Sequence, residues 1–285
     1  NWTVFDTSNS DLPVNRIITI AIDNNGNKWI STYNGGLVKF DGSNWAIYDP
    51  TNSGLPSYAV TSIAFDNNGN KWLGCHNSKL ALFDDSSWTV YTGCWGCGEM
   101  KSIAIDVNGE LWIGTLDNGL AHFDGTAWTM YNTSNSDLPN NKIYSMVIDI
   151  SGNKWIGNHL GGLIKFDGTN WTVYNTSNSG LPDNFIRLVI IDATGDKWIS
   201  TYNGDLVKFD GSIWTPYNTS NSILTSNKVA PIITDSNGNI WLGVGGTSDG
   251  SLAKYDGLDW TVYPSGWIFS IAFDSSDNEI GRAHV

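Results

Sequence analysis

Tryptophan recurs along this chain at a nearly constant spacing, and this spacing limits the folds that the chain can adopt. One series occupies positions 29, 72, 112, 155, 198 and 241, with steps of 43, 40, 43, 43 and 43 residues. A second series occupies positions 2, 45, 88, 128, 171, 214 and 260, with steps of 43, 43, 40, 43, 43 and 46 residues. Thirteen of the fifteen tryptophans therefore belong to a repeat, which indicates a stacked or radial array of similar units.

Each repeat unit has the pattern of four short strands joined by turns. In the first complete unit we expect strands at residues 18–22, 28–32, 37–40 and 45–48. The segment Asp-Asn-Asn-Gly-Asn at 23–27 is typical of a hairpin turn, because Asn and Gly tolerate positive φ and Asp accepts nearby backbone N–H groups. Four antiparallel strands per repeat of about 40–45 residues are typical of a propeller blade. The sequence therefore predicts an all-β protein, a β-propeller with six complete blades.

The two ends of the chain have the patterns of parts of a seventh unit. Residues 2–5 match the fourth strand of a blade, and residues 267–274 match the first strand. We therefore expect a split seventh blade, with strand d from the N-terminus and strand a from the C-terminus. Residues 1–279 then form a single propeller domain. Residues 280–285 break the repeat, and we interpret them as a non-native tail introduced by a sequence read, with the true chain continuing further.

Composition and charge exclude several classes of protein. The formal net charge is −13 and the pI is about 4.4, which argues against binding to nucleic acid or to anionic membranes. No run of eighteen apolar residues is present, so we expect no membrane insertion. Charged residues make up 15% of the chain, and Asn, Ser, Thr and Gly are abundant. This balance favours a secreted protein in an extracellular or periplasmic location.

The repeated motif also resembles a known family. The segments 171–184 (WTVYNTSNSGLPDN), 190–199 (IIDATGDKWI) and 206–211 (LVKFDG) resemble the two-component regulator propeller repeat, and the resemblance extends over residues 1–279. In that family such propellers are commonly seven-bladed. They form periplasmic sensor regions of hybrid histidine kinases and also occur in secreted bacterial proteins. The resemblance implies a binding or sensing domain.

One loop position varies between repeats while its neighbours hardly change. The residue four places after each Trp of the first series is Tyr33, His76, Leu116, His159, Tyr202 or Gly245. Drift of an unconstrained loop explains this variation, and so does divergence at a binding surface. Aromatic faces beside amides and carboxylates suit a carbohydrate or a peptide. The candidate ligand-binding rim therefore consists of Tyr33, Asn34, His76, Trp95, Asp117, His159, Tyr202 and Asn203.

The repeated Trp and Asp residues have structural and functional interpretations. Large aromatic side chains at fixed blade positions fill the space between sheets, although they could also stack on a ligand. The Asp that ends each first strand caps a turn in the structural interpretation. In the alternative, these Asp residues form a cation site on the axis of the ring: Asp23, Asp66, Asp106, Asp149, Asp192, Asp235 and Asp274.

The three cysteines fall in one blade. Cys94 and Cys97 replace the usual connection after the second blade, and Cys75 ends a strand of the same blade. A local disulfide between Cys94 and Cys97 is expected in an oxidising compartment. A zinc site formed by Cys75, His76, Cys94 and Cys97 has suitable ligand types but is not favoured. We expect no cofactor.

Five tripeptides match the N-glycosylation sequon, although Asn and Thr are common in this chain. The candidate acceptors are Asn1, Asn132, Asn170, Asn175 and Asn218.

Two classes of function follow from these patterns. No nucleophile elbow or phosphate-binding glycine loop is present, and we predict that the protein is not an enzyme. The first class is a binding module that takes a carbohydrate or peptide ligand on the rim. The alternative is a structural subunit of an extracellular filament, which self-associates head-to-tail through its terminal strands.

Overall fold

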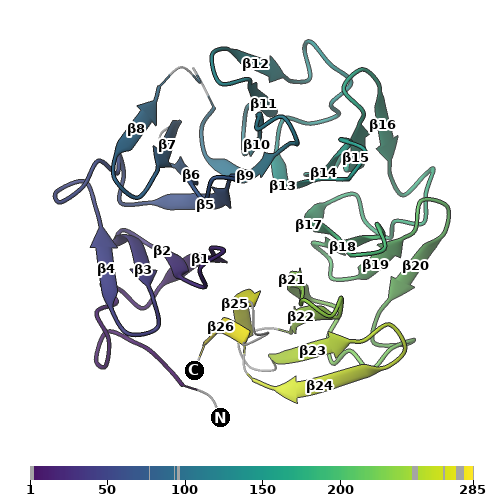
Figure 1. The fold of residues 1–285 in the computed structure, drawn as a ribbon. Coiled ribbons are helices and arrows are strands. Elements are labelled where there is room, and N and C mark those ends of the chain that lie inside the picture. Colours follow the sequence, from purple (N-terminus) through teal and green to yellow (C-terminus); the bar gives the residue numbers. More distant parts are fainter. Residues whose placement is uncertain are drawn as a thin grey trace.

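The protein is a ring of antiparallel sheets arranged around a central axis (Figure 1). The computed structural model describes residues 3–76, 78–92, 94, 97–245, 250–265, 267–273 and 279–284. Six sheets have four strands each, in the order in which the strands follow along the chain. The predicted all-β propeller with six complete blades is confirmed.

The first strand of each blade lies nearest the axis and the fourth lies at the periphery (Figure 1). Blades one to three consist of β1 (Ile17–Ile22), β2 (Lys28–Thr32), β3 (Gly36–Phe40), β4 (Trp45–Tyr48); β5 (Val60–Phe65), β6 (Lys71–Cys75), β7 (Lys79–Phe83), β8 (Trp88–Tyr91); and β9 (Met100–Ile105), β10 (Leu111–Thr115), β11 (Leu120–Phe123), β12 (Trp128–Tyr131). Blades four to six consist of β13 (Ile143–Ile148), β14 (Lys154–Asn158), β15 (Gly162–Phe166), β16 (Trp171–Tyr174); β17 (Ile186–Ile191), β18 (Lys197–Thr201), β19 (Leu206–Phe209), β20 (Trp214–Tyr217); and β21 (Val229–Thr234), β22 (Ile240–Val244), β23 (Ser251–Tyr255), β24 (Trp260–Pro264).

The predicted split seventh blade is not confirmed. The inner strand β25 (Trp267–Phe273) pairs with β26 (Glu279–His284) in a two-stranded sheet. Residues 3–6 form no strand, because no described strand lies beside them to accept and donate backbone hydrogen bonds. Because β26 pairs in the register of a second strand, residues 279–284 extend the sheet. The non-native origin of residues 280–285 stays a prediction.

The N-terminal segment nevertheless packs where a preceding blade would end. The ring of Phe5 contacts Phe40 and Trp45 at centroid distances of 5.4 and 5.5 Å. In blade four, Tyr131 of the preceding blade makes the same two contacts, with Phe166 and Trp171, at 5.3 and 5.9 Å. Phe5 of the same chain therefore covers Phe40 and Trp45 of the first blade.

The core lies between adjacent blades. Trp155 of blade four is buried against Leu181, Ile186 and Phe209, which come from blade five and the loop before it. The ammonium group of Lys197, the first residue of β18, lies 4.6 Å from the centre of the Trp155 ring. Lys154 covers Trp112 in the same way at 4.0 Å. The repeated Trp and Lys thus hold consecutive blades together, as the structural interpretation of the Trp series predicts.

A β-bulge interrupts the inner strand of each complete blade close to its start. In β17 the register shifts between Ile186 and Leu188, and Arg187 has no partner in β18. In β13 the same shift leaves Tyr144 unpartnered. A bulge turns a side chain out of the regular pleat, and bulges are common beside binding sites. The unpaired positions in blades one, two and three are Ile18, Thr61 and Lys101.

Candidate functional site

The meander topology gives the ring two different faces. We call one the loop face: it carries the loops between the second and third strands and the connections between blades. The opposite turn face carries the turns between the first and second and between the third and fourth strands. On the loop face, Tyr33 N–H donates to Arg16 O at 2.8 Å, and Gly36 N–H donates to Tyr58 O at 2.9 Å. These bonds tie the two kinds of loop into one surface.

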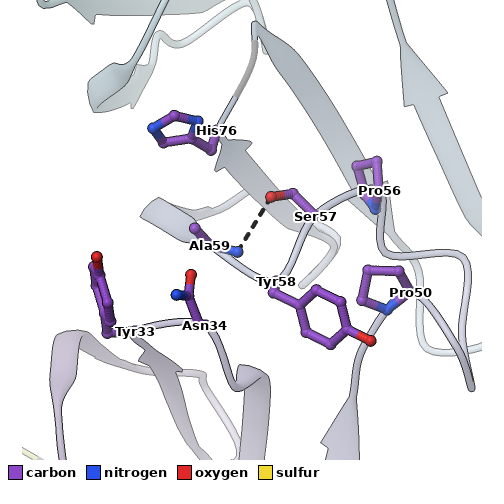
Figure 2. Close-up of a pocket in the computed structure, with 8 residues that line it drawn as sticks. All are labelled: Tyr33, Asn34, Pro50, Pro56, Ser57, Tyr58, Ala59 and His76. Carbon is purple, nitrogen blue, oxygen red and sulfur yellow. Dashed lines mark hydrogen bonds between the residues drawn. The ribbon is translucent and has the colours of Figure 1, made fainter.

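A cleft of about 480 Å³ opens on the loop face between blades one and two. Figure 2 shows Tyr33 and Asn34 on the side of blade one, with His76 across from them on blade two. The connection between the blades supplies the remaining lining residues, namely Pro50, Pro56, Ser57, Tyr58 and Ala59. The cleft combines two aromatic rings with an imidazole and an amide, a mixture that suits an oriented polar ligand with flat apolar faces.

Two local features fix the position of Tyr33 and Asn34 at this cleft. The guanidinium carbon of Arg16 lies 3.9 Å from the centre of the Tyr33 ring, which holds the ring by a cation–π contact. Asn34 has φ of 61°, a left-handed conformation that Asn adopts more readily than most residues. The loop is therefore shaped by its own residues, and both side chains stay exposed.

A second group of aromatic residues lies on the loop face over blades four and five. We call Tyr144, His159, Phe185 and Tyr202 the aromatic cluster. Phe185 stacks on Tyr202 at 4.7 Å with an angle of 4° between the ring planes, and it meets His159 edge-on at 4.5 Å. Tyr144 lies 4.9 Å from Phe185. Tyr202 keeps 60% of its surface exposed, so the cluster presents a flat aromatic face to solvent.

Polar atoms beneath the aromatic cluster lack partners within the described part of the chain. Nδ1 of His159 and Oδ1 of Asn158 are buried without a hydrogen bond. The side-chain amide of Asn158 donates to Asn140 O at 2.6 Å, which fixes the orientation of its unpaired oxygen. Buried polar atoms in proteins are normally satisfied by another protein group or by ordered water.

The structure divides the predicted rim between these two places. Tyr33, Asn34 and His76 line the cleft, whereas His159 and Tyr202 belong to the aromatic cluster. Asn203 lies beside the cluster, and its amide donates to Asp183 at 2.7 Å. Asp117 is exposed in the corresponding loop of blade three and lines neither place. Trp95 lies outside the described residues.

Sequence reasoning missed three aromatic residues of this face. Tyr58 and Phe185 lie just before β5 and β17, and Tyr144 occupies the bulge of β13. For Tyr144 a signal was present, because the bulge positions differ between blades while the flanking positions hardly change: Ile18, Thr61, Lys101, Tyr144 and Arg187. The bulge that makes these positions special depends on pairing with the second strand, and a local pattern does not reveal it.

The cysteines do not assemble a metal site. Cys94 and Cys97 form a disulfide with 5.5 Å between their Cα atoms, and each sulfur lies 4.0 Å from Met130 Sδ. Cys75 is a free thiol buried in the core between blades one and two, where burial raises its pKa to about 12. Within the described residues, no group of three His, Cys, Asp or Glu residues is arranged to hold a metal ion.

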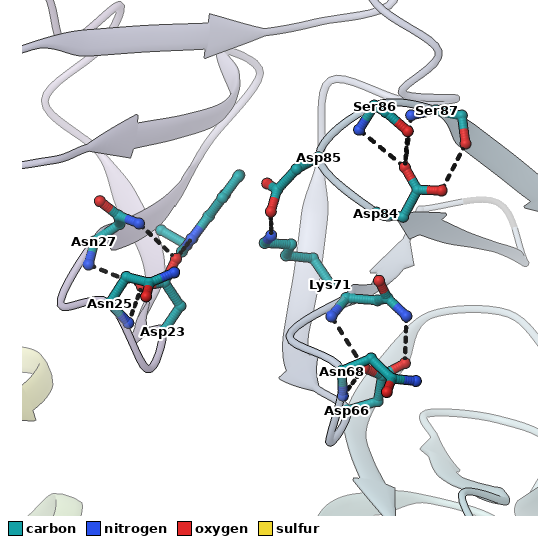
Figure 3. A network of polar contacts seen from close by, with 12 residues as sticks. Asp23, Asn25, Asn27, Asp66, Asn68, Lys71, Asp84, Asp85, Ser86 and Ser87 are labelled. Atoms are coloured by element: carbon teal, nitrogen blue, oxygen red, sulfur yellow. Dashed lines mark hydrogen bonds and ion pairs between the residues drawn. The ribbon is translucent and has the colours of Figure 1, made fainter.

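The repeated Asp residues are committed to the turn face and not to the axis. Each one described accepts the indole N–H of the Trp six residues later, at 2.8–3.3 Å. Figure 3 shows the surrounding turns of blades one and two, in which Asp23 and Asp66 also accept bonds from neighbouring Asn residues. The alternative of an axial cation site is therefore wrong for these six residues.

The sequon asparagines of the connections between blades cap their own turns. Oδ1 of Asn175 accepts the backbone N–H of Ser177 at 2.9 Å, and Asn132 and Asn218 do the same for Ser134 and Ser220. Asp6 and Asp49 make the equivalent bonds in other connections, so the turn requires the oxygen that both residue types share. Asn170 is exposed in a turn of blade four, and Asn1 lies outside the described residues. Glycosylation stays a prediction.

The fold defines this chain as a β-propeller, and comparisons with solved structures find propellers of similar shape. No family model and no curated protein match the chain. Among solved structures, it is similar to the extracellular domain of the hybrid two-component system BT3049 from B. thetaiotaomicron, with a TM-score of 0.81 and 22% identity. The match covers 98% of this chain and 39% of that one, so this chain spans about two fifths of its length. The fold thus agrees with the resemblance that the repeat carries.

Other similar structures have different descriptions. A streptogramin B lyase matches with a TM-score of 0.79 and 12% identity, over 95% of this chain and 92% of the lyase. A structure described as YCF48 bound to D1 peptide matches with a TM-score of 0.69 and 16% identity, over 95% and 90% of the two chains. At these identities the likeness concerns the fold. Within the described residues, no helix has the length and hydrophobicity that crossing a membrane requires.

Proposed function

We propose that this chain is a non-enzymatic binding domain, extracellular or periplasmic, whose loop face binds a carbohydrate or a peptide. The observation that carries the proposal is the concentration of exposed aromatic side chains at loop-face positions that do not repeat. Tyr33, Tyr58 and Tyr202 keep 46%, 41% and 60% of their surface exposed. Packing in the repeat explains the buried Trp series but does not account for these three. Propellers of similar fold come from extracellular domains and, in the case of YCF48, from a complex with a peptide.

The composition of the cleft supports binding rather than catalysis. His76 is the titratable ring at its wall opposite Tyr33, and the lining residues include no Asp, Glu, Lys or Cys. A general acid and a general base working together require two titratable groups with separated pKa values. The lining holds tyrosines and one His and no carboxylate, a composition that suits a binding surface.

The alternative of a head-to-tail filament has less support. Phe5 packs against Phe40 and Trp45 of its own chain, and this contact uses the segment that strand donation would require. We therefore favour the binding domain.

An array of immobilised glycans and peptides, probed with the labelled protein, tests the proposed function. We expect binding to a restricted set of ligands, and we expect Tyr33→Ala together with Tyr202→Ala to abolish it. Ile150→Ala is the matched control, because Ile150 is fully exposed at a turn tip on the opposite face. Retained binding in the double variant, or equal loss in the control, would overturn the assignment to the loop face.

A further inference from the structure

Resting on the proposed function, we infer that the ligand of the loop face is an acidic polysaccharide whose carboxylates are held by a ring of cationic side chains around the axis. The argument begins with how the chain distributes its fifteen Lys and Arg residues. Seven of the fifteen belong to the blade framework, where they cover Trp rings at 4.0–5.7 Å: Lys39, Lys71, Lys154, Lys165, Lys197, Lys208 and Lys254. These lysines serve blade packing.

Five of the other eight cations lie at or just before the loop-face starts of the inner strands. Arg16, Lys142 and Lys228 lie immediately before the inner strands β1, β13 and β21. Lys101 and Arg187 occupy the bulges of β9 and β17. The inner strands surround the axis (Figure 1), so the backbone positions of these five residues lie at its loop-face end, and we call the five residues the cationic ring. Four of them are exposed, and Lys101 pairs with Glu99 at 2.5 Å.

This arrangement stands out in an acidic protein. The net charge is −13, and the turn face carries the Asp residues of the repeated turns, such as Asp23, Asp66 and Asp84 in Figure 3. A local cluster of cations on such a surface attracts anions to one place, while the remaining surface repels them. The nearby carboxylates Glu99 and Asp183 already hold Lys101 and the amide of Asn203. The loop face also carries exposed carboxylates such as Asp117 and Asp137, and the proposal requires the cations at the starts of the inner strands to outweigh them there.

The cationic ring adjoins the aromatic cluster. Arg187 follows Phe185 by two residues, and Lys142 precedes Tyr144 by two, so each cation lies on the same inner strand segment as a cluster ring. Lys142 O also accepts the backbone N–H of His159 at 2.9 Å. Blade one repeats the combination, with Arg16 against Tyr33 at 3.9 Å. Planar rings beside guanidinium groups offer stacking and bidentate carboxylate recognition at the same place.

The backbone of the loop face favours a sugar chain over an acidic peptide. Extended peptides are commonly bound by pairing with an open strand edge. In all six complete blades, the first backbone N–H of the loop between the second and third strands already donates to a carbonyl of the preceding connection. In blade five, for example, Tyr202 N–H donates to Phe185 O at 2.9 Å. Recognition on this face therefore depends on side chains. A uronate polymer supplies what they recognise, a flat ring face and a carboxylate in every residue.

Binding of the full chain to three polymers tests this inference, measured by affinity electrophoresis. The polymers are polygalacturonate, the same polymer with its carboxylates methyl-esterified, and polyglutamate. We expect tight, salt-sensitive binding to polygalacturonate and weaker binding to the other two. The variant Lys142→Gln/Arg187→Gln should bind polygalacturonate at least about tenfold more weakly and the ester unchanged. Lys165→Gln/Lys254→Gln makes the same change in charge on framework residues and should bind like the unchanged protein.

The outcomes separate this inference from the proposed function. If Tyr202→Ala weakens binding to the acid and the ester alike, while Lys142→Gln/Arg187→Gln weakens neither, the loop face binds carbohydrate and the cationic ring has no part in it. Tighter binding to polyglutamate than to polygalacturonate would overturn the choice of a polysaccharide in favour of an acidic peptide. Absence of binding to polygalacturonate would also overturn the inference, and the glycan and peptide array then decides separately on the proposed function.

Discussion

Oδ2 of Asp149 accepts a hydrogen bond from the indole N–H of Trp155 at 2.9 Å, across the turn between β13 and β14. Oδ1 of the same carboxylate accepts the backbone N–H groups of Ser151 and Asn153 at 3.0 and 2.9 Å. One side chain therefore closes the turn and satisfies the polar atom of a buried ring. This relationship explains why Asp and Trp recur together at a separation of six residues.

Replacing Asp149 removes both roles at once. We expect Asp149→Ala to destabilise the protein by about 2–4 kcal/mol, because it leaves the indole N–H and two turn N–H groups without an acceptor. Asp167→Ala is the control, since exposed Asp167 caps a turn of the same blade without contacting a Trp. Chemical denaturation measures both. Equal losses for the two variants would show that the bond to Trp155 adds nothing.

The stability of the folded protein should decrease as the pH falls below about 4. Burial raises the pKa of Asp149, but its hydrogen bonds from Trp155, Asn153 and Ser151 outweigh burial, and the net pKa is lowered. Hydrogen bonds lower the pKa of Asp41, Asp124 and Asp167 to about 2. Because the folded pKa lies below the usual 3.8, this stabilisation is present above that value and is lost as the pH falls from about 4 towards 2.

Thermal melting across this pH range checks the expected dependence. Tm should be nearly constant above about pH 5 and should fall steeply below about pH 4. Asp149→Asn should have a lower Tm at neutral pH and a shallower fall in acid, since it has lost one titrating group. A Tm that stays constant or rises down to pH 3 would contradict the assignment.

Substitutions at two glycines of blade four distinguish the cost of backbone strain from the cost of a steric clash. Gly162 and Gly168 have φ of 85° and 104°, a region that disfavours other residues. A Cβ at Gly168 meets nothing within 4 Å, whereas a Cβ at Gly162 would collide with Tyr174 O. We expect Gly168→Ala to cost about 1–2 kcal/mol and Gly162→Ala about 3 kcal/mol or more. Similar melting shifts would show that the loop relaxes around Gly162.

Buried and exposed aromatic residues should respond oppositely in stability and binding. Trp155 is 4% exposed, and we expect Trp155→Ala to cost about 3–5 kcal/mol by opening a cavity between blades. Tyr202 is 60% exposed and stacks on Phe185, so Tyr202→Ala should cost about 1 kcal/mol or less. Ligand binding should be lost in Tyr202→Ala although the protein stays folded. Equal decreases in Tm for the two variants would contradict the assignment of Trp155 to the core and Tyr202 to the exposed rim.

Much of the fold could be predicted because the same local sequence pattern occurs in six repeats. The strands of blade one were expected at residues 18–22, 28–32, 37–40 and 45–48, and the observed strands differ by one residue at most at their ends. The seventh unit was not predictable in the same way. Strand d there depends on a neighbouring strand to supply hydrogen bonds, and the sequence of residues 2–5 carries no information on whether that strand is present.

The candidate site could be predicted in part. Variation between repeats identified Tyr33, His76 and Tyr202, because their neighbours are constant and loop residues escape the packing that fixes the core. Tyr144 was missed since it belongs to an inner strand, where a local pattern predicts burial, and Phe185 was missed since it directly precedes one. The contacts of Phe185 with Tyr144 and His159 join two blades, and such contacts depend on how neighbouring blades pack.

Hydrogen–deuterium exchange with the best ligand from the array tests the central claim most directly. If the loop face is the binding surface, ligand should slow exchange around residues 33–34, 57–59, 158–160 and 185–187, and leave the turns at 107–109, 150–152 and 257–259 unchanged. The two sets lie on opposite faces of the ring, so each protein molecule contains its own control. Protection confined to the turns, or spread equally over both faces, would contradict the account.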